Sequence, residues 1–409
     1  MPILDHLEPR AVFSCFEQLC AIPHGSGNTK AISDYLVRFA AEHQLRCIQD
    51  AHNNIIIFAP GTPGYESAAP VILQGHMDMV CETAPDCTKD MAREGLDLFV
   101  DGDTIGARGT TLGGDDAIAV AMALAILAAD DIPHPPLEVV ITVDEETGML
   151  GAAALDASVL KGRTMLNLDS EDEGVLTVSC AGGNVSVCTL PVTRAPFDGQ
   201  TLRVRISGLA GGHSGEDIHR GHGNATTLLM RTLLALEEQG IPFRLGPVAG
   251  GSFRLAIPRD AHAVVCFPAD QEKAVEQAVQ EQEAVMRREF PITGAQLRLT
   301  LAQAPAPGWC AEAGPVITAA LLAPDGIYQM NEALLGLVDS SDNMGEFYLE
   351  EGQLRLVFEI RSAQASVGNY LYQRICRLAK VLGGQCVTDK AYPSWEFRAE
   401  SSFRDIADQ

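Results

Sequence analysis

Acidic side chains and one histidine stand directly after four apolar segments of this sequence. These residues are His76, Asp78, Asp115, Glu145, Glu146 and Asp169. Three of the segments, at 71–75, 139–143 and 164–168, have the apolar, β-branched composition of buried strands. Asp115 instead follows a glycine pair at the start of a helical pattern. Residues of these types are typical metal ligands and general bases.

The fold expected for these segments would bring the side chains together. In open α/β sheets, ligands bind at the carboxyl ends of strands and at the adjacent helix starts. Carboxylates held in one crevice repel one another unless cations neutralise them, because an unpaired buried charge is strongly destabilising. The pattern therefore predicts a metal centre.

Ligands for two ions can be assigned within this cluster. A dinuclear hydrolytic centre needs a bridging carboxylate, further nitrogen or oxygen ligands, and a carboxylate base that accepts the proton of a metal-bound water. We expect His76, Asp115 and Asp169 at one ion, and Asp115 with Glu146 at the other. Glu145 is then the base, because adjacent side chains on an extended backbone point to opposite sides.

Asp78 has a different expected role. It lies two residues after His76 on the same side of a predicted strand, where it can accept the ring N–H that faces away from a metal. Each motif alone is a weak signal, since an isolated Asp-Glu-Glu is usually a solvated turn and an isolated histidine is usually structural. Their joint occurrence in four similar places is what favours a metal centre.

Two domains are expected to carry these residues. Strands and helices alternate up to about residue 190, which predicts an α/β domain with a mostly parallel sheet covered on both faces. From 191 to 390 the pattern is strand, helix, strands and helix, twice, which predicts an α+β domain of two similar halves. One strand of this domain is expected at Phe253–Ile257. Residues 391–409 are expected to return to the first domain.

Composition limits the class of protein. The chain has 409 residues and 46% hydrophobic content, enough for about two globular domains. Its net charge of -25 argues against nucleic acid or an anionic membrane as a partner. The start lacks a signal-peptide pattern and no long apolar run is present, so a cytoplasmic protein is expected. The eleven scattered cysteines are expected to be free thiols.

Several motifs resemble those of the co-catalytic zinc metallopeptidases, a family that includes aminoacylases, glutamate carboxypeptidases and carnosinase-like dipeptidases. The metal motifs lie at 75–80, 110–116, 144–148 and 167–170. Four further motifs are most similar to the branch of bacterial dipeptidases that act on Xaa-His substrates. They lie at 179–183, 211–215, 223–225 and 391–395.

This resemblance implies a catalytic α/β domain with an inserted lid, and hydrolysis of the peptide bond in a dipeptide by two zinc ions, with cobalt or manganese as alternatives. It implies the same ligands, base and histidine orientation as the residues did alone. It adds His213 of the lid, which would polarise the scissile carbonyl, and Arg361, which would bind the substrate carboxylate. The resemblance is also compatible with a homodimer.

The sequence departs from the family in one place that bears on metal binding. The family takes the last ligand of the second zinc from a histidine near the carboxyl end, whereas the last histidine here is His262. We therefore expect a truncated chain with a complete first zinc site and an incomplete second one. Gly114 and Asp116 stand where the family has alanine and asparagine, and neither is an expected ligand.

Alternative functions remain open at this stage. The same zinc centre would serve a deacylase or a tripeptidase, in which only the pocket of the lid would differ. An inactive relative that binds metal or a partner without turnover is the third possibility. The glycine-rich loop at 211–215 and Arg361 also have simpler interpretations, as a flexible connection and as a surface ion-pair partner.

Overall fold

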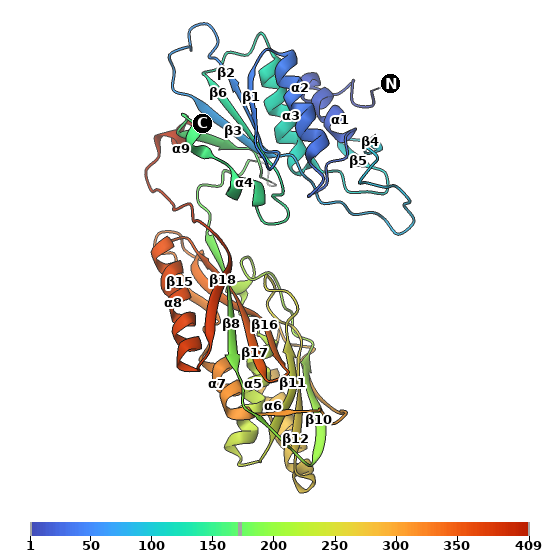
Figure 1. Ribbon diagram of the computed structural model, residues 1–409, viewed down its shortest axis with the longest axis vertical. Coiled ribbons are helices and arrows are strands. Elements are labelled where there is room, and N and C mark those ends of the chain that lie inside the picture. Colours follow the sequence, from blue (N-terminus) through green and yellow to red (C-terminus); the bar gives the residue numbers. More distant parts are fainter. Residues whose placement is uncertain (1, 171–173, 408–409) are drawn as a thin grey trace. The chain divides into compact units, whose positions relative to one another are not determined.

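The computed structural model describes residues 2–170 and 174–407. The chain forms two compact units, Met1–Val175 and Leu176–Gln409. Most of their elements are labelled in Figure 1. Each unit has its own sheet and its own apolar core. All eleven cysteines are free, as predicted.

The division between the units falls earlier than the change in sequence pattern at residue 190. Strand β8 (Gly182–Pro191) pairs along its whole length with β17 (Gln353–Ser362) and over most of it with β18 (Gln385–Tyr392), so it belongs to the second sheet. Its partners lie far along the chain, so no local pattern in the sequence shows that it belongs to the second sheet. The return of residues 391–409 to the first domain stays a prediction.

The first unit is an α/β unit with a mixed sheet. Its helices are α1 (Arg10–Cys20), α2 (Lys30–Glu42), α3 (Gly114–Ala128) and α4 (Leu150–Ala154). Its main sheet has the order β1 (Arg46–Gln49), β2 (Ile55–Ala59), β6 (Leu137–Thr142), β3 (Val71–His76) and β7 (Thr164–Asn167). The strands β6, β3 and β7 are parallel, as expected, while β1 and β2 add two antiparallel pairings.

Alternation along the strands buries both faces of this sheet. Ile55, Ile57 and Val139 face the core that also contains residues of α1, α2 and α3. Ile56 and Val140 face the other side, where the segment after α4 packs against them. The aliphatic residues at nearly every position of β6 are therefore explained by burial on both faces.

The parallel register fixes where the acidic residues lie. His76 is paired with Thr142 across β3 and β6, and Gln74 is paired with Asn167 across β3 and β7. The residues that follow these three strands therefore leave the sheet at one edge. This is the arrangement that the sequence predicted for the cluster.

Asn54 holds both ends of the turn that follows β6. Its side-chain oxygen accepts the N–H of Val143 at 3.1 Å, and its amide donates to the carbonyl oxygen of Gly151 at 3.0 Å. Asn54 is buried, and the backbone of Gly151 lies so close that an added Cβ would be 2.3 Å from the carbonyl oxygen of Val143. The turn at 144–150 is therefore tied at both of its ends.

The second unit contains an 11-stranded sheet that runs through both predicted halves. The strands other than β8, β17 and β18 are β9 (Arg194–Ala195), β10 (Gln200–Ser207), β11 (Arg244–Gly250), β12 (Ala261–Phe267), β13 (Arg298–Gln303), β14 (Cys310–Glu312), β15 (Gly326–Met330) and β16 (Val338–Glu350). The helices are α5 (Ala225–Glu238), α6 (Glu272–Glu289), α7 (Ala313–Leu322), α8 (Ala365–Val381) and α9 (Ser402–Ala407). The halves meet where β11 pairs with β16, at Val248 and Leu349.

The strand predicted at Phe253–Ile257 is wrong. The strand that continues the sheet is β11, and residues 253–256 form a turn with an isolated bridge from Ala256 to His213. Gly246 and Pro247 lie inside β11, and the pairing with β12 shifts register between Leu245 and Val248. A proline in a strand is usual only at an edge or at a bulge, so sequence pattern disfavoured the real strand.

Among the described residues, no helix has both the length and the apolarity that crossing a membrane requires.

Replacing Gly151 by alanine tests the tie at the 144–150 turn. The added Cβ would meet backbone of Val143 and the side chain of Asn54, so we expect a loss of about 1–3 kcal/mol in the free energy of unfolding. Urea unfolding measures the change. The control is Gly114→Ala, whose Cβ would meet only Leu112 Cδ2 at 3.8 Å. Equal stability of the two variants would contradict the close packing at Gly151.

Candidate metal centre

His76 is a buried residue of the centre, and Asp78 sets the orientation of its ring. Its side chain is buried at the end of β3, and Nδ1 lies 3.0 Å from the main-chain oxygen of Asp78 and 3.4 Å from its carboxylate. The main chain of Asp78 is thus the nearer partner, where the sequence predicted the carboxylate. Because Nδ1 faces Asp78, only Nε2 remains available to a cation, and Nε2 lies 2.9 Å from Asp115 Oδ1.

The carboxylate of Asp78 connects two other segments to the histidine. It accepts the hydroxyl of Ser26 at 2.8 Å and the backbone N–H of Glu145 at 3.1 Å. These bonds and the neighbouring imidazole lower the pKa of Asp78, although burial, the largest effect, acts in the opposite direction. Asp78 therefore stays ionised and orients both the histidine and the turn that carries the expected base.

Two sets of side chains come close enough together to hold a metal ion. One contains His76, Asp116 and Asp169, and the other contains His76, Asp115 and Glu146, with the ligand atoms of each set within 4.8 Å of one another. The sequence placed Asp169 with Asp115 and gave Asp116 no role. Both sets include His76. Because only one nitrogen of His76 is free, the histidine can bind an ion in one of the two sets at a time.

Asp116 is the residue that sequence reasoning missed. It is buried, and its Oδ2 accepts the backbone N–H of His76 at 3.0 Å. Asp115 is half-exposed, with 52% of its side chain accessible, and faces the ring nitrogen instead. The adjacency of two aspartates at a helix start was visible in the sequence, but their opposite directions were not.

Glu145 and Glu146 lie in a turn rather than on an extended backbone. Asp144 has a φ of +53°, and the N–H groups of Gly148 and Met149 both donate to the carbonyl oxygen of Glu145. The argument that extended backbone separates the two glutamates therefore does not apply. Their separation follows from the turn, which is held by Asn54 and by Gly27, whose N–H donates to Asp144 at 2.6 Å.

The cluster creates a strongly negative site. Burial and the charge of Asp169 raise the pKa of Asp116 to about 7, and burial together with neighbouring carboxylates raises the pKa values of Glu145 and Glu146. Burial alone would lower the pKa of His76, but hydrogen bonds and charges from the surrounding aspartates raise it to about 10. A site with this potential favours a positive charge at its centre.

His213 lies in the second unit, on the loop between β10 and α5. Its Nδ1 accepts the backbone N–H of Glu216 at 3.2 Å, and its own backbone N–H donates to Asp217 at 2.8 Å. Since Nδ1 accepts a hydrogen bond, the neutral ring carries its proton on Nε2. His213 thus presents a hydrogen-bond donor from a loop that is fixed by its own backbone.

Arg361 lies near the end of β17 and converges with His213. A Cβ added to Gly215 would be 3.2 Å from Nε of Arg361 and 3.3 Å from Cε1 of His213, so both side chains approach the same backbone position. Nη1 of Arg361 lies 3.4 Å from the hydroxyl of Tyr392. Burial raises the pKa of Glu359, two residues earlier on the strand, and the charges of Arg361 and Arg254 oppose this rise; the ion pair of Glu359 is with Arg254, at 3.3 Å.

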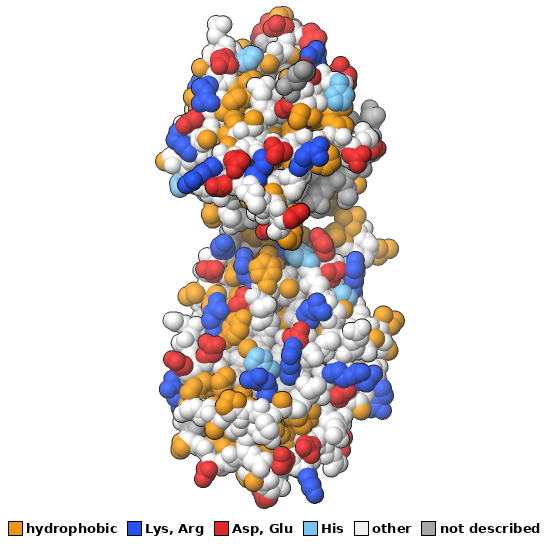
Figure 2. Space-filling model, turned by 90° about the vertical axis from the view of Figure 1, so that its right-hand side faces the viewer, with side chains coloured by type: hydrophobic (Ala, Val, Ile, Leu, Met, Phe, Trp, Pro, Cys, Tyr) orange, Lys and Arg blue, Asp and Glu red, His pale blue; other side chains and the backbone are white. Residues whose placement is uncertain are grey.

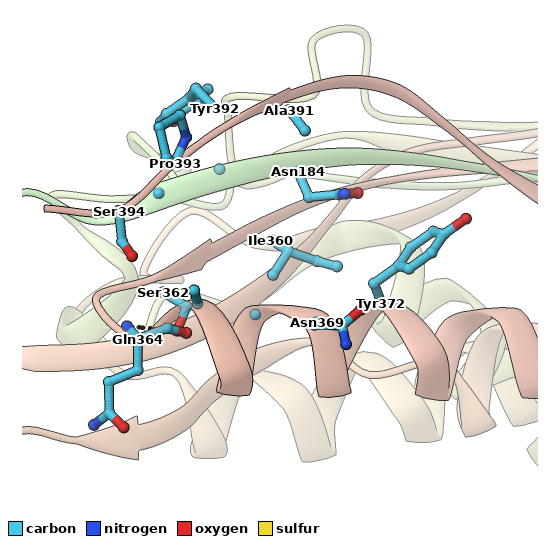
Figure 3. A pocket seen from close by; sticks show the side chains of 14 residues that line it. Asn184, Ile360, Ser362, Gln364, Asn369, Tyr372, Ala391, Tyr392, Pro393 and Ser394 are labelled. Atoms are coloured by element: carbon cyan, nitrogen blue, oxygen red, sulfur yellow. Dashed lines mark hydrogen bonds between the residues drawn. The ribbon is translucent and has the colours of Figure 1, made fainter. Parts of the chain in front are cut away.

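Two of the motifs behind the family resemblance pack against each other beside Arg361. Cys180 and Trp395 exchange backbone hydrogen bonds of 2.9 Å, and a Cβ on Gly183 would be 2.3 Å from the ring of Tyr392. Figure 3 shows the pocket of about 200 Å³ lined by this segment, by β8 and by the start of α8. The glycines at 182 and 183 therefore give the segment with Tyr392 its place beside the sheet.

Comparison with known proteins gives consistent matches. The family model described as "Peptidase dimerisation domain" matches residues 204–293. The cytosol non-specific dipeptidase of Escherichia coli is 34% identical over 98% of this chain and 84% of its own length. The crystal structure of aminoacylhistidine dipeptidase from Vibrio alginolyticus is also 34% identical, covers 98% of this chain and 83% of that one, and has a TM-score of 0.89.

The chain belongs to the M20 metallopeptidase family. The resemblance stated from the sequence motifs is therefore confirmed, and so is the α/β class with a separate second domain. The relatives that establish the family are dipeptidases.

The residues of this M20 centre suit divalent cations. One imidazole and several carboxylates form a donor set that zinc, cobalt and manganese accept. The raised pKa values of the carboxylates show a repulsion that a bound cation would relieve. The donor set does not distinguish among these metals.

Substituting the two adjacent aspartates tests which one is a ligand. We expect Asp115→Asn to abolish tight cation binding, because Asp115 faces Nε2 of His76. Asp116→Asn should weaken binding by about tenfold or less, because an amide oxygen can still accept the N–H of His76. Zinc titration against a competing chelator measures both. The reverse order of effects would assign the ligand role to Asp116.

Proposed function

We propose that the chain is a metal-dependent dipeptidase in which Glu145 is the general base. The observation that carries this proposal is the position of Glu145 beside the ligand cluster, with its backbone bonded to Asp78 and its pKa raised by burial and by neighbouring carboxylates. A carboxylate with a raised pKa is a more effective proton acceptor near neutral pH. The dipeptidase activity of the relatives supports the same reaction.

The metal ligands in this proposal are those expected from the sequence: His76, Asp115 and Asp169 at one ion, Asp115 and Glu146 at the other. Zinc is the proposed metal, with two ions in a complete centre, and cobalt or manganese as substitutes. Such ions supply Lewis acidity, which makes water more acidic and a carbonyl more electrophilic. Asp78 fixes His76, and Asp116 supports the main chain of His76 in this assignment.

Proton transfer is the task of Glu145. In the proposed reaction it accepts a proton from the attacking water and returns it to the nitrogen of the leaving amino acid. Charge balance is preserved because the carboxylate ends the cycle in its starting state. The hydrogen bond from its backbone N–H to Asp78 ties the base to the residue that orients the histidine.

His213 would stabilise the negative charge that develops on the substrate carbonyl oxygen. Its Nε2–H is the donor, because Nδ1 is occupied by the N–H of Glu216. Arg361 would bind the free carboxylate of the dipeptide, for which a planar guanidinium is well suited. The hydroxyl of Tyr392, 3.4 Å from Nη1, holds this arginine in position.

The proposed substrates are small dipeptides with a free carboxylate, either Xaa-His or a broader set. The relatives carry both kinds of description, one non-specific and one aminoacylhistidine. We also propose a cytoplasmic location, in line with the cytosolic relative. A homodimer is proposed as one assembly, because residues 204–293 match a peptidase dimerisation domain.

Glu145→Gln tests the base. With zinc, cobalt or manganese supplied, we expect the chain to hydrolyse Gly-His or β-Ala-His, and the variant to lose about 10²–10⁴-fold in kcat. Metal content should not change. The matched control is Glu276→Gln on α6, which leaves the centre untouched. Metal binding without turnover in the unmodified chain would favour the inactive relative, and turnover confined to acylated amino acids would favour a deacylase.

Arg361→Lys tests carboxylate binding. Because lysine cannot form the paired hydrogen bonds of a guanidinium, we expect KM for the dipeptide to rise about 10–100-fold. The C-terminal amide of the same dipeptide should show the same KM with either enzyme. The exposed Arg355→Lys, on the same strand, is the control. A similar loss on both substrates would show that Arg361 acts on structure rather than on the carboxylate.

A further inference from the structure

We propose that a groove on the second unit binds a small polyanion that carries two or more phosphate groups. This arginine groove has a volume of about 520 Å³ and is lined by parts of β10, β11 and β12 and by the turn before β12. Its charged lining residues are Arg203, Arg205, Arg259, Asp260 and His262. It includes neither the metal centre nor the residues proposed for catalysis.

The groove lies on the face of the sheet that the helices leave uncovered. Along β10, Leu202, Val204 and Ile206 are buried in the core shared with α5 and α6. The alternation of a strand therefore places Arg203 and Arg205 on the opposite face, where both are exposed. His262 is paired with Arg205 in the register of β12, so the basic residues are neighbours on one surface.

The positive charge of the groove is largely unbalanced. Asp260 pairs with Arg205 at 3.0 Å, but among the described residues no carboxylate lies within 4.0 Å of the cationic groups of Arg203 or Arg259. Figure 2 shows basic side chains beside a histidine on one face of the second unit. Burial lowers the pKa of His262, and Arg203 and Arg205 lower it further, as an uncompensated positive field requires.

Such a concentration of cations is unexpected from composition. The chain has 54 acidic and 29 basic residues, so a random surface groove should be acidic. Lysine is absent from the lining, and all three long basic residues are arginines. Arginine is the residue best suited to phosphate, because its planar guanidinium donates two parallel hydrogen bonds.

The spacing of the arginines indicates the size of the ligand. Arg203 and Arg205 are two residues apart on one strand face, about 7 Å along the strand. This separation suits a ligand with two linked anionic groups better than a single phosphate. Phe253 also lines the groove and is 54% exposed, which offers an apolar surface to a group attached to the phosphates. Pyrophosphate and a nucleoside diphosphate share this chemistry.

Calorimetric titration of the full chain tests the proposal. Metal ions are first removed, so that phosphates cannot bind to a cation at the metal centre. At low ionic strength we expect saturable binding of pyrophosphate and of ADP, weakened about 10-fold or more in Arg203→Gln. Asp260→Asn should strengthen binding about 2–5-fold, because it frees Arg205.

The control is Arg377→Gln on α8, an exposed arginine outside the groove, with the same change in net charge. It should leave binding unchanged. Tighter binding of ADP than of pyrophosphate would identify a nucleotide, and equal binding would identify the phosphates alone. No saturable binding, an equal loss in Arg377→Gln, or no gain in Asp260→Asn would each overturn the proposal. Circular dichroism checks that every variant is folded.

Discussion

Mutual repulsion among crowded, partly buried carboxylates is the constraint on which the first unit depends. Asp116, Glu145 and Glu146 each have a pKa raised by burial and by their neighbours, yet three parallel strands and a helix start deliver them to one place. Such a cluster is stable only if the surrounding structure holds it and a positive charge compensates it. The raised pKa of His76 reflects the same field. Rigid supports, such as the buried amide of Asn54, are what prevent the cluster from opening.

Much of this could be predicted from the sequence, because its signals are local. Apolar runs that end in acidic residues give both the strands and the edge at which the residues meet. His76, Asp115 and Glu146 lie within reach of one ion, whereas Asp169 lies with Asp116 rather than with the predicted Asp115, so the assignment of ligands stays a prediction. The burial of Asp116 could not be predicted. It depends on how two adjacent residues are oriented at the start of α3, where their backbone angles are not helical.

The second unit shows a different limit of sequence reasoning. Its helices α5, α6 and α8 occur in the predicted order of strands and helices, since their apolar periodicity is strong. Strand β11 was missed because Gly246 and Pro247 lie within it, and β8 was assigned to the wrong unit because its partners are far away along the chain. Pairing between distant segments is decided by tertiary packing, which a local pattern does not contain.

The continuity of the second sheet has a mechanical consequence. His213 follows β10 in the first half of the unit, whereas Arg361 lies on β17 in the second half, and the two halves are joined by the pairing of β11 with β16. The strand that precedes His213 and the strand that carries Arg361 are therefore linked by main-chain hydrogen bonds within one sheet, in the order β10, β12, β11, β16 and β17. Bending between the halves would break these hydrogen bonds, so the sheet fixes the separation between the backbones of His213 and Arg361.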